Sequence, residues 1–242
     1  MKRKLQIHIV IPVYNEQQIL EKNILKLNSF LRFEEYADWQ ITIADNASTD
    51  NTPVIAQRLA KNYSNVHTLH LDQKGMGLAL KKASYLRNSD IICYIDADLS
   101  TGISYLPKLV SAITNGSAIA TGNRYDAKAV VKRHISRTIL SRCYNVLAKM
   151  IIRTEIKDLQ CGFKAISRQA KEEILPNVDN NLFFFYSELL IWAEKMGYNI
   201  AEVPVIWKES ERRTKIDILN TAKNYILDLF RLRKRLKIKG LL

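Results

Sequence analysis

The sequence predicts an α/β fold in which a doubly wound, mostly parallel sheet is covered by helices. Over the first hundred of its 242 residues, short β-branched runs alternate with longer stretches whose apolar residues recur at helical spacing. That order is typical of parallel strands joined by helical crossovers. The runs are mostly apolar, as expected of strands buried on both faces. Apolar residues make up 47% of the chain, which suffices for a sizeable core and excludes a disordered protein.

The chain is predicted to open as a strand, a short polar loop and a helix. The strand is expected over residues 7–11, where a β-branched run ends at Pro12. Asn15 stands where a helix-capping residue is expected, before a helix over about residues 16–31.

The second strand is predicted over residues 40–44 and leads into a polar cluster at 45–50. Thr52 is expected to cap the next helix, with Pro53 at its first position, where the missing N–H is harmless. The remaining elements of this half are a strand at 66–71, a helix at 75–87 and a strand at 91–95.

Polar clusters follow three of these predicted strands, at residues 12–16, 45–50 and 96–98. The carboxyl ends of parallel strands share one edge of a sheet, and ligands of such sheets bind beyond that edge. The sequence therefore predicts that the three clusters form one site.

The charge of the chain suggests an anionic partner. Lys and Arg number 37 against 24 Asp and Glu. Two stretches, residues 128–153 and 231–239, carry seven and six basic residues and no acid, and apolar residues are interleaved in both. That pattern fits an interfacial helix better than a solvated face. We expect a catalytic domain over residues 1–210 and a basic amphipathic tail over 211–242, with Arg133 and Arg137 guiding an anionic acceptor.

The expected location is the cytoplasm, peripherally on the cytoplasmic face of a membrane. Three cysteines, without CxxC spacing, and a start that reads as a strand favour a reducing compartment. No window of the sequence approaches the length of an apolar spanning helix. The four histidines show no ligand spacing, so zinc is not expected.

The pair Asp96 and Asp98 is the candidate metal site. Two carboxylates at the mouth of a buried strand do not readily both ionise without a counter-charge. Mg²⁺ and Mn²⁺ are commonly held by one or two carboxylates together with substrate phosphates. An isolated Asp-x-Asp would more often cap a turn, so the assignment depends on the motifs around it.

Those motifs occur in a familiar order. The chain contains Ile9-Val-Ile-Pro-Val-Tyr-Asn-Glu16, Asp45-Asn-Ala-Ser-Thr-Asp50, Lys74-Gly-Met-Gly-Leu-Ala79, Tyr94-Ile-Asp-Ala-Asp-Leu-Ser100, Gly122-Asn-Arg124, Asp158-Leu-Gln-Cys-Gly-Phe-Lys164, Ser187-Glu-Leu-Leu190 and Glu202-Val-Pro-Val-Ile-Trp207. Together they resemble the family 2 glycosyltransferases, which have the GT-A fold. The later motifs resemble the dolichyl- or polyprenyl-phosphate mannose and glucose synthases.

On the donor side, the resemblance implies that Pro12, Tyr14 and Glu16 line the nucleotide pocket. Asp45 would contact the nucleoside, beside Asn46, where many relatives have a second Asp.

The resemblance also implies roles around the metal. Asp96 would lie near the donor and Asp98 would coordinate Mg²⁺ or Mn²⁺. Ser100, a weaker ligand, stands where the synthase branch often has Gln. Arg124 would face the diphosphate or the acceptor phosphate. Gly75 offers a backbone N–H that suits a phosphate, although a tight turn explains it equally well.

On the acceptor side, the resemblance implies that Asp158, Gln160 and the turn at 162–163 shape the site. Relatives commonly carry an Asp where this chain has Tyr186, so only Glu188 of that motif transfers.

The expected reaction is transfer of a sugar, with inversion, from a UDP- or GDP-linked donor to a polyprenyl phosphate. An anionic acceptor needs no general base, which a hydroxyl acceptor requires. One alternative is a soluble family 2 enzyme that acts on a saccharide or a protein. Another is a catalytically silent module that binds a nucleotide or an anionic surface. No nucleic-acid-binding pattern is present. The sugar, the base and a membrane-protein partner are left open.

Overall fold

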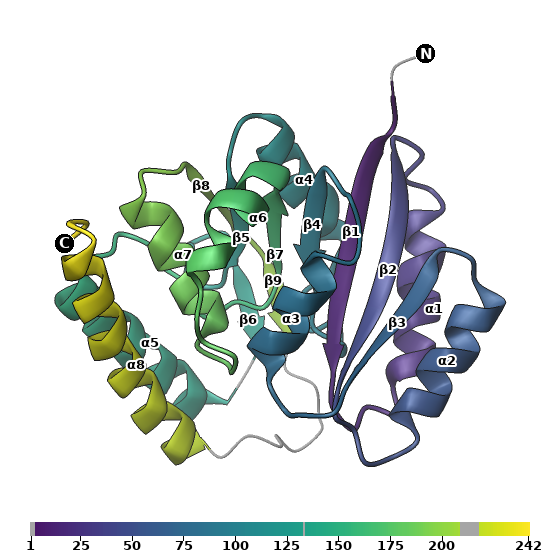
Figure 1. Cartoon of the computed structure of the whole chain (residues 1–242), viewed down its shortest axis with the longest axis horizontal. Coiled ribbons are helices and arrows are strands. Elements are labelled where there is room, and N and C mark those ends of the chain that lie inside the picture. Colours follow the sequence, from purple (N-terminus) through teal and green to yellow (C-terminus); the bar gives the residue numbers. More distant parts are fainter. Residues whose placement is uncertain (1–2, 133, 209–217) are drawn as a thin grey trace.

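The computed structural model describes residues 3–132, 134–208 and 218–242. Its centre is a seven-stranded sheet of order β3-β2-β1-β4-β7-β5-β8, in which only β7 runs antiparallel to its neighbours (Figure 1). The predicted doubly wound, mostly parallel sheet is confirmed. The strands are β1 (Leu5–Val13), β2 (Ala37–Asn46), β3 (Val66–Leu71), β4 (Ile91–Tyr94), β5 (Ile119–Asn123), β7 (Lys164–Ser167) and β8 (Ile200–Pro204).

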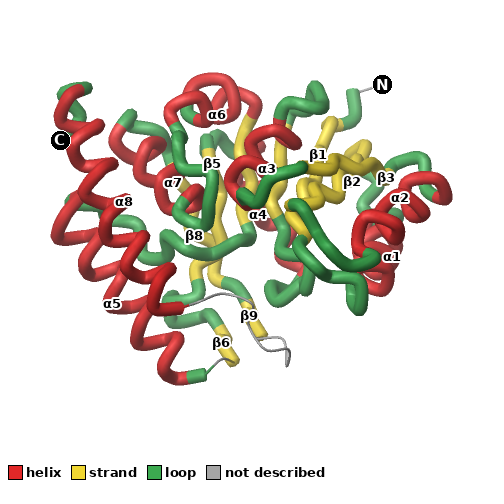
Figure 2. The backbone as a smooth tube through the Cα atoms, turned by 60° about the horizontal axis from the view of Figure 1, so that its bottom comes forward, coloured by secondary structure: helices red, strands yellow, loops and turns green. Residues whose placement is uncertain are grey.

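Two short strands, β6 (Val130–Lys132) and β9 (Ile206–Lys208), form a separate parallel pair. Helices cover both faces of the large sheet (Figure 2). They are α1 (Leu20–Leu31), α2 (Thr52–Asn62), α3 (Met76–Ser84), α4 (Leu106–Thr114), α5 (Ile135–Ile152), α6 (Arg168–Glu173), α7 (Phe185–Lys195) and α8 (Ile218–Ile238), with 3₁₀ turns at Ile103–Tyr105 and Leu175–Asn177.

The alternation of side chains along the strands builds two cores. Ile7, Ile9 and Ile11 of β1 point to the face that α1, α2 and α4 cover, whereas Val10 points to the face of α3 and α7. This follows from the two-residue period of a strand. Each face of the sheet therefore buries its own hydrophobic cluster.

Helix α8 packs against α5 and contributes Leu229, Leu232 and Leu236 to the same core as α7. The predicted boundary near residue 210 lies outside the described residues, so the division into 1–210 and 211–242 stays a prediction. Within the part of the chain that is described, no helix combines the length and apolar character needed to span a membrane.

The first helix begins later than predicted. It starts at Leu20, and Asn15 does not cap it. Asn15 instead adopts a left-handed backbone (φ 54°) within the loop that follows β1. Thr52 is likewise the first residue of α2 rather than its cap, and its backbone N–H donates to Asp50 at 2.9 Å. Side-chain contacts between the loops after β1 and β2 outweigh helix capping here.

Candidate active site

The predicted polar clusters converge at one edge of the sheet. Parallel pairing places Val13 beside Asp45, and Asp45 beside His70. Strands β1 and β4 are also parallel, so Asp96, two residues after β4 ends, emerges at this same edge. Strand β7 runs the other way, so the segment that precedes it reaches this edge as well. Residues from five strands thus border one site.

The loops after β1 and β2 are joined by hydrogen bonds. Asn15 accepts from the backbone N–H of Thr49 at 2.7 Å, and its own N–H donates to Ser48 Oγ at 2.9 Å. The N–H of Glu16 donates to Thr52 Oγ1 at 2.8 Å. Asn15 therefore serves to join the two loops that were expected to hold the nucleotide.

Asp45 is buried and held on both carboxylate oxygens. Its Oδ1 accepts from the N–H of Ser48 at 3.2 Å, and its Oδ2 lies 2.6 Å from His70 Nδ1. His70 is half exposed at the end of β3. A carboxylate fixed in this way presents its remaining lone pairs to a ligand in one orientation.

Two further donor-side residues contact each other, because Asn46 Oδ1 accepts from the N–H of Gly75. The N–H of Gly75 is therefore already hydrogen-bonded within the protein, as expected if this glycine serves a tight turn. A Cβ on Gly75 would meet the carbonyl oxygen of Asn181 at 2.9 Å. Close packing of α3 against the 180–181 loop accounts for this glycine. Nearby, Lys74 Nζ lies 4.3 Å from the centroid of the Tyr14 ring, and Pro12 is half-buried on β1.

The acidic pair lies at the centre of the edge. Burial, followed by the neighbouring Asp98 carboxylate, raises the pKa of Asp96 to about 6. Asp98 Oδ1 accepts from the N–H of Ser100 at 3.0 Å. No group of three or more His, Cys, Asp or Glu side chains able to hold a metal occurs among the described residues. A pair of carboxylates nevertheless fits Mg²⁺ or Mn²⁺, which take further oxygen ligands from substrate phosphates.

Gly162 lies against the Asp96 carboxylate. A Cβ at this position would lie 2.3 Å from Oδ2 and 2.4 Å from Oδ1. Only glycine leaves room for the carboxylate where it stands. The turn at 162–163, placed on the acceptor side by the sequence, therefore contacts the acidic pair directly.

Arg124 and Asp158 form a buried bidentate ion pair. Arg124 Nε lies 2.8 Å from Oδ2 and Nη2 lies 2.9 Å from Oδ1, and the backbone N–H of Arg124 also donates to Oδ2. Burial alone would raise the pKa of Asp158, but the charge and hydrogen bonds of Arg124 outweigh it and lower that pKa. The guanidinium also faces the Trp207 ring, at 5.8 Å from its centroid.

A buried lysine completes the charge cluster. Lys164 Nζ donates to Thr121 Oγ1 at 3.0 Å and to the carbonyl of Cys161. Burial lowers the pKa of Lys164 to about 8, against the opposing effects of neighbours that include Asp158 and Asp96. Its Nζ lies 5.0 Å from the centroid of the Tyr186 ring. The site thus holds two cations, Lys164 and Arg124, among its carboxylates.

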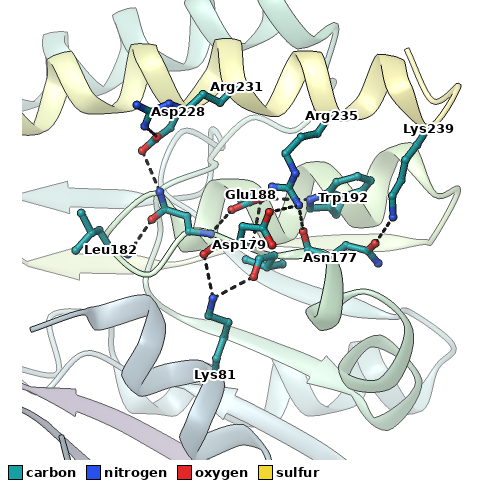
Figure 3. A network of polar contacts seen from close by, with 12 residues as sticks. Lys81, Asn177, Asp179, Leu182, Glu188, Trp192, Asp228, Arg231, Arg235 and Lys239 are labelled. Carbon is teal, nitrogen blue, oxygen red and sulfur yellow. Dashed lines mark hydrogen bonds and ion pairs between the residues drawn. The ribbon is translucent and has the colours of Figure 1, made fainter. Parts of the chain in front are cut away.

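Glu188 is engaged within the protein (Figure 3). Its carboxylate accepts from the N–H of Asn180 at 2.8 Å and of Asp179 at 3.2 Å, and it pairs with Arg235 of α8. Trp192 Nε1 adds a longer contact at 3.4 Å. The carboxylate expected on the acceptor side therefore also anchors the C-terminal helix to α7.

The remaining acceptor-side residues are less closely grouped. Gln160 Oε1 is buried without a hydrogen-bond partner among the described residues. Arg137 lies half-buried on α5, and Arg133 falls outside the described residues. The acceptor-side roles of these residues remain predictions.

The structure places in the site two residues for which the sequence predicted no role, His70 and Lys164. For the turn at 162–163 the sequence predicted an acceptor-side role, but not the close approach of Gly162 to Asp96. Lys164 carried a signal, as a charge at the start of an apolar strand. His70 carried none, because its importance depends on Asp45, which is 25 residues away in the sequence.

The sheet order and the carboxylates at its edge define the class as glycosyltransferases of the GT-A fold. Glucosyl-3-phosphoglycerate synthase from Mycobacterium tuberculosis, solved with UDP, has this fold: it superimposes with a TM-score of 0.73 at 19% identity, covering 95% of this chain and 80% of that one. The chain belongs to glycosyl transferase family 2, whose model matches residues 8–175.

Two relatives illustrate the family. The glycosyltransferase AglD of Haloferax volcanii is 34% identical over 220 residues, an alignment that covers 88% of this chain and 35% of the relative. This chain thus spans about a third of that protein. The dolichyl-phosphate beta-glucosyltransferase of Saccharomyces cerevisiae is 30% identical over 242 residues, covering 90% of this chain and 72% of the relative.

Proposed function

We propose that the chain transfers a hexose, with inversion, from a nucleoside-diphosphate sugar to a polyprenyl phosphate at a membrane surface. The observation that carries the proposal is the acidic pair Asp96 and Asp98, which lies at the carboxyl edge of the sheet beside the buried cations Arg124 and Lys164. The names of the yeast relative and of the polyprenol monophosphomannose synthase of Mycolicibacterium smegmatis support the acceptor class. Glucose is the first sugar to test.

The donor would bind across the loops after β1, β2 and β4. Asp45, oriented by His70 and Ser48, would accept hydrogen bonds from the base or the ribose. Asp98 would hold the divalent cation, with Asp96 beside it. A bound Mg²⁺ or Mn²⁺ supplies positive charge to the departing nucleoside diphosphate. Arg124, fixed by two hydrogen bonds to Asp158, adds a cation whose position is preorganised.

The engaged state of Glu188 favours an acceptor that is already an anion. A hydroxyl acceptor needs a general base within hydrogen-bond reach. The Glu188 carboxylate instead accepts two backbone hydrogen bonds and pairs with Arg235. A phosphate monoester is ionised near neutral pH and can attack the anomeric carbon without losing a proton. A lipid phosphate is therefore a better candidate acceptor than a saccharide or a protein.

The outward face of α5 supports the membrane surface as partner. Its four most exposed apolar residues recur at intervals of four and seven, which places them on one stripe of the helix. The buried residues of α5, Tyr144, Ala148 and Ile152, lie on the opposite side. Exposed Arg142 and Lys149 flank the stripe and suit anionic lipid headgroups. The stripe consists of Ile135, Ile139, Val146 and Met150.

Calorimetric titration with UDP- and GDP-sugars tests the donor, in the presence of Mn²⁺ and in the presence of EDTA. We expect one donor to bind only with the metal, and Asp98→Ala to abolish that binding. Glu35→Ala, which removes an exposed carboxylate far from the edge, is the matched control. If no donor binds to the unaltered protein, the enzyme assignment is wrong.

The acceptor is tested separately by product formation with the donor identified above. Transfer to dolichyl phosphate in detergent, without transfer to free saccharides, supports the proposal. Turnover with a water-soluble saccharide or peptide alone would establish the soluble alternative instead.

A further inference from the structure

A second polar site lies at the opposite, amino-terminal edge of the sheet. A hollow of about 240 Å³ opens there between the strands and the loop that joins α3 to β4. His8 and Tyr14 are six residues apart on and just beyond β1, roughly 20 Å at the rise of a strand. The hollow, hereafter the amino-edge pocket, is therefore separate from the candidate active site. It is lined by Gln6, Ile7, His8, Asp38, Gln40, Leu86, Arg87, Asn88 and Ser89.

The sheet face below the pocket is polar, although the same face carries apolar core residues further along the strands, such as Val10 and Ala44. Gln6 and His8 of β1 pair in register with Asp38 and Gln40 of β2. His8 is completely buried. A buried histidine normally has hydrogen-bond partners for both ring nitrogens, whereas Nδ1 of His8 has none among the described residues. Packing of the hydrophobic core does not explain why these polar side chains lie together at the base of the pocket.

Two buried polar atoms lining the pocket have no partner in the described residues: His8 Nδ1 and Ser89 Oγ. The other ring nitrogen, His8 Nε2, lies 2.7 Å from Thr42 Oγ1. Burial lowers the pKa of His8 to about 4, so the ring is neutral at pH 7 and carries one N–H. A threonine hydroxyl can donate as well as accept, so Nδ1 is free to carry that proton and donate it.

The charges around the pocket favour an anion. Arg87 lines it, and within the described chain no hydrogen bond or ion pair engages its guanidinium. After burial, the positive charges of Arg87 and Lys171 also contribute to the lowered pKa of His8. Asp38 lies exposed at the rim, where its carboxylate accepts from Gln40 Nε2 at 3.2 Å.

We propose that the amino-edge pocket binds a small oxyanion of the phosphate class. Arg87 would supply the charge, and Ser89 Oγ and His8 Nδ1 would donate hydrogen bonds to its oxygens. The oxygens of such an anion have several lone pairs that accept hydrogen bonds. The guanidinium of Arg87 and the two unpartnered groups, Ser89 Oγ and His8 Nδ1, can donate to them. The anion is either free phosphate or the phosphate group of a larger molecule. This site does not depend on the proposed glycosyl transfer.

The four histidines of the chain make the test selective. His8 and His67 report on the amino-edge pocket, His70 reports on the candidate donor site, and His134 begins the α5 region. Their imidazole signals are followed by NMR while inorganic phosphate, and separately glycerol 3-phosphate, replaces chloride at constant ionic strength. His67→Gln, His70→Gln and His134→Gln assign three signals, and His8 is the fourth.

We expect saturable shifts of the His8 and His67 signals, lost in Arg87→Gln and weakened several-fold in Ser89→Ala. Arg58→Gln, which removes a surface arginine of α2 that pairs with Glu21, is the control and should behave like the unaltered protein. A response to inorganic phosphate identifies a free anion, and a response to the phosphomonoester alone identifies a larger ligand. The proposal is overturned if His8 does not respond to either compound, as expected of a pocket that holds only water, or if Arg87→Gln leaves the response intact.

Discussion

The guanidinium of Arg124 and the carboxylate of Asp158 face each other in a bidentate ion pair at 2.8 and 2.9 Å, with the Asp158 side chain wholly buried. Removal of one partner from such a pair leaves an uncompensated buried charge, which costs about 3–5 kcal/mol. We therefore expect Asp158→Asn and Arg124→Gln each to lower the free energy of unfolding by about 3 kcal/mol.

A double variant shows whether the loss of stability comes from the broken ion pair or from general disruption of the fold. If the two residues act through their mutual contact, Arg124→Gln combined with Asp158→Asn should cost clearly less than the sum of the single changes. Urea unfolding of the four proteins measures the coupling. Strict additivity would show that the ion pair does not link the two residues energetically.

Gly162→Ala should impair activity more than stability. The new Cβ would lie within 2.6 Å of the Asp96 carboxyl group, so this carboxylate must move away from its present position. If Asp96 acts in catalysis as proposed, its displacement is expected to cost about 100-fold in kcat/KM. Gly102→Ala is the matched control, because its nearest contact would be an ordinary 3.5 Å from Tyr105. Equal activities of the two variants would contradict the prediction.

His70 is expected to act on donor affinity through Asp45. His70→Ala removes the 2.6 Å contact to Asp45 Oδ2 and leaves the carboxylate free to rotate. The donor KM should rise several-fold while kcat changes little, because the interaction is made equally in the ground and transition states. His67→Ala, on the same strand but contacting Gln40, serves as the control. A fall in kcat at unchanged KM would count against a donor-positioning role.

Stability should fall as the pH drops from 6.5 towards 4, because of His8. Its pKa is lowered to about 4 in the folded protein, so between these values only the unfolded chain binds the proton. Stability is therefore fully present above pH 6.5 and is lost on acidification, by about 2 kcal/mol between pH 7 and pH 5. Urea unfolding at these two pH values measures the loss. His8→Gln, which does not titrate, should show a loss smaller by that amount.

The apolar faces of α5 and α8 should govern binding to membranes. Phe230 of α8 and Met150 of α5 are both largely exposed. Phe230→Glu and Met150→Glu are expected to reduce cosedimentation with anionic liposomes at least several-fold. Phe33→Glu is the control, since Phe33 is 85% exposed just beyond α1, far from these helices. If all three variants bind alike, or the unaltered protein ignores liposomes at low salt, the membrane proposal is wrong.

The fold and the edge where the acids gather followed from the sequence. Alternating apolar runs and helical stretches indicated the parallel sheet, and parallel strands necessarily bring their carboxyl ends together. Strand 66–71 was predicted with its observed bounds. The start of α1 was not, because Asn15 bonds to Thr49 across two loops rather than to its own helix. Helix capping is predicted from residues that are neighbours in the chain, so the competing hydrogen bond between Asn15 and Thr49 is not foreseen.

The sequence by itself determined which chemistry the chain carries: Asp96 and Asp98 after a buried strand, and the order of motifs that marks the family. Only the tertiary structure decided which groups are already engaged and which point outward. Glu188 is tied to Arg235, 47 residues further along, and Asp45 to His70. The amino-edge pocket exists because a loop closes over polar strand residues. Such relationships depend on distances through space between residues remote in the chain, which local patterns of residue type do not encode.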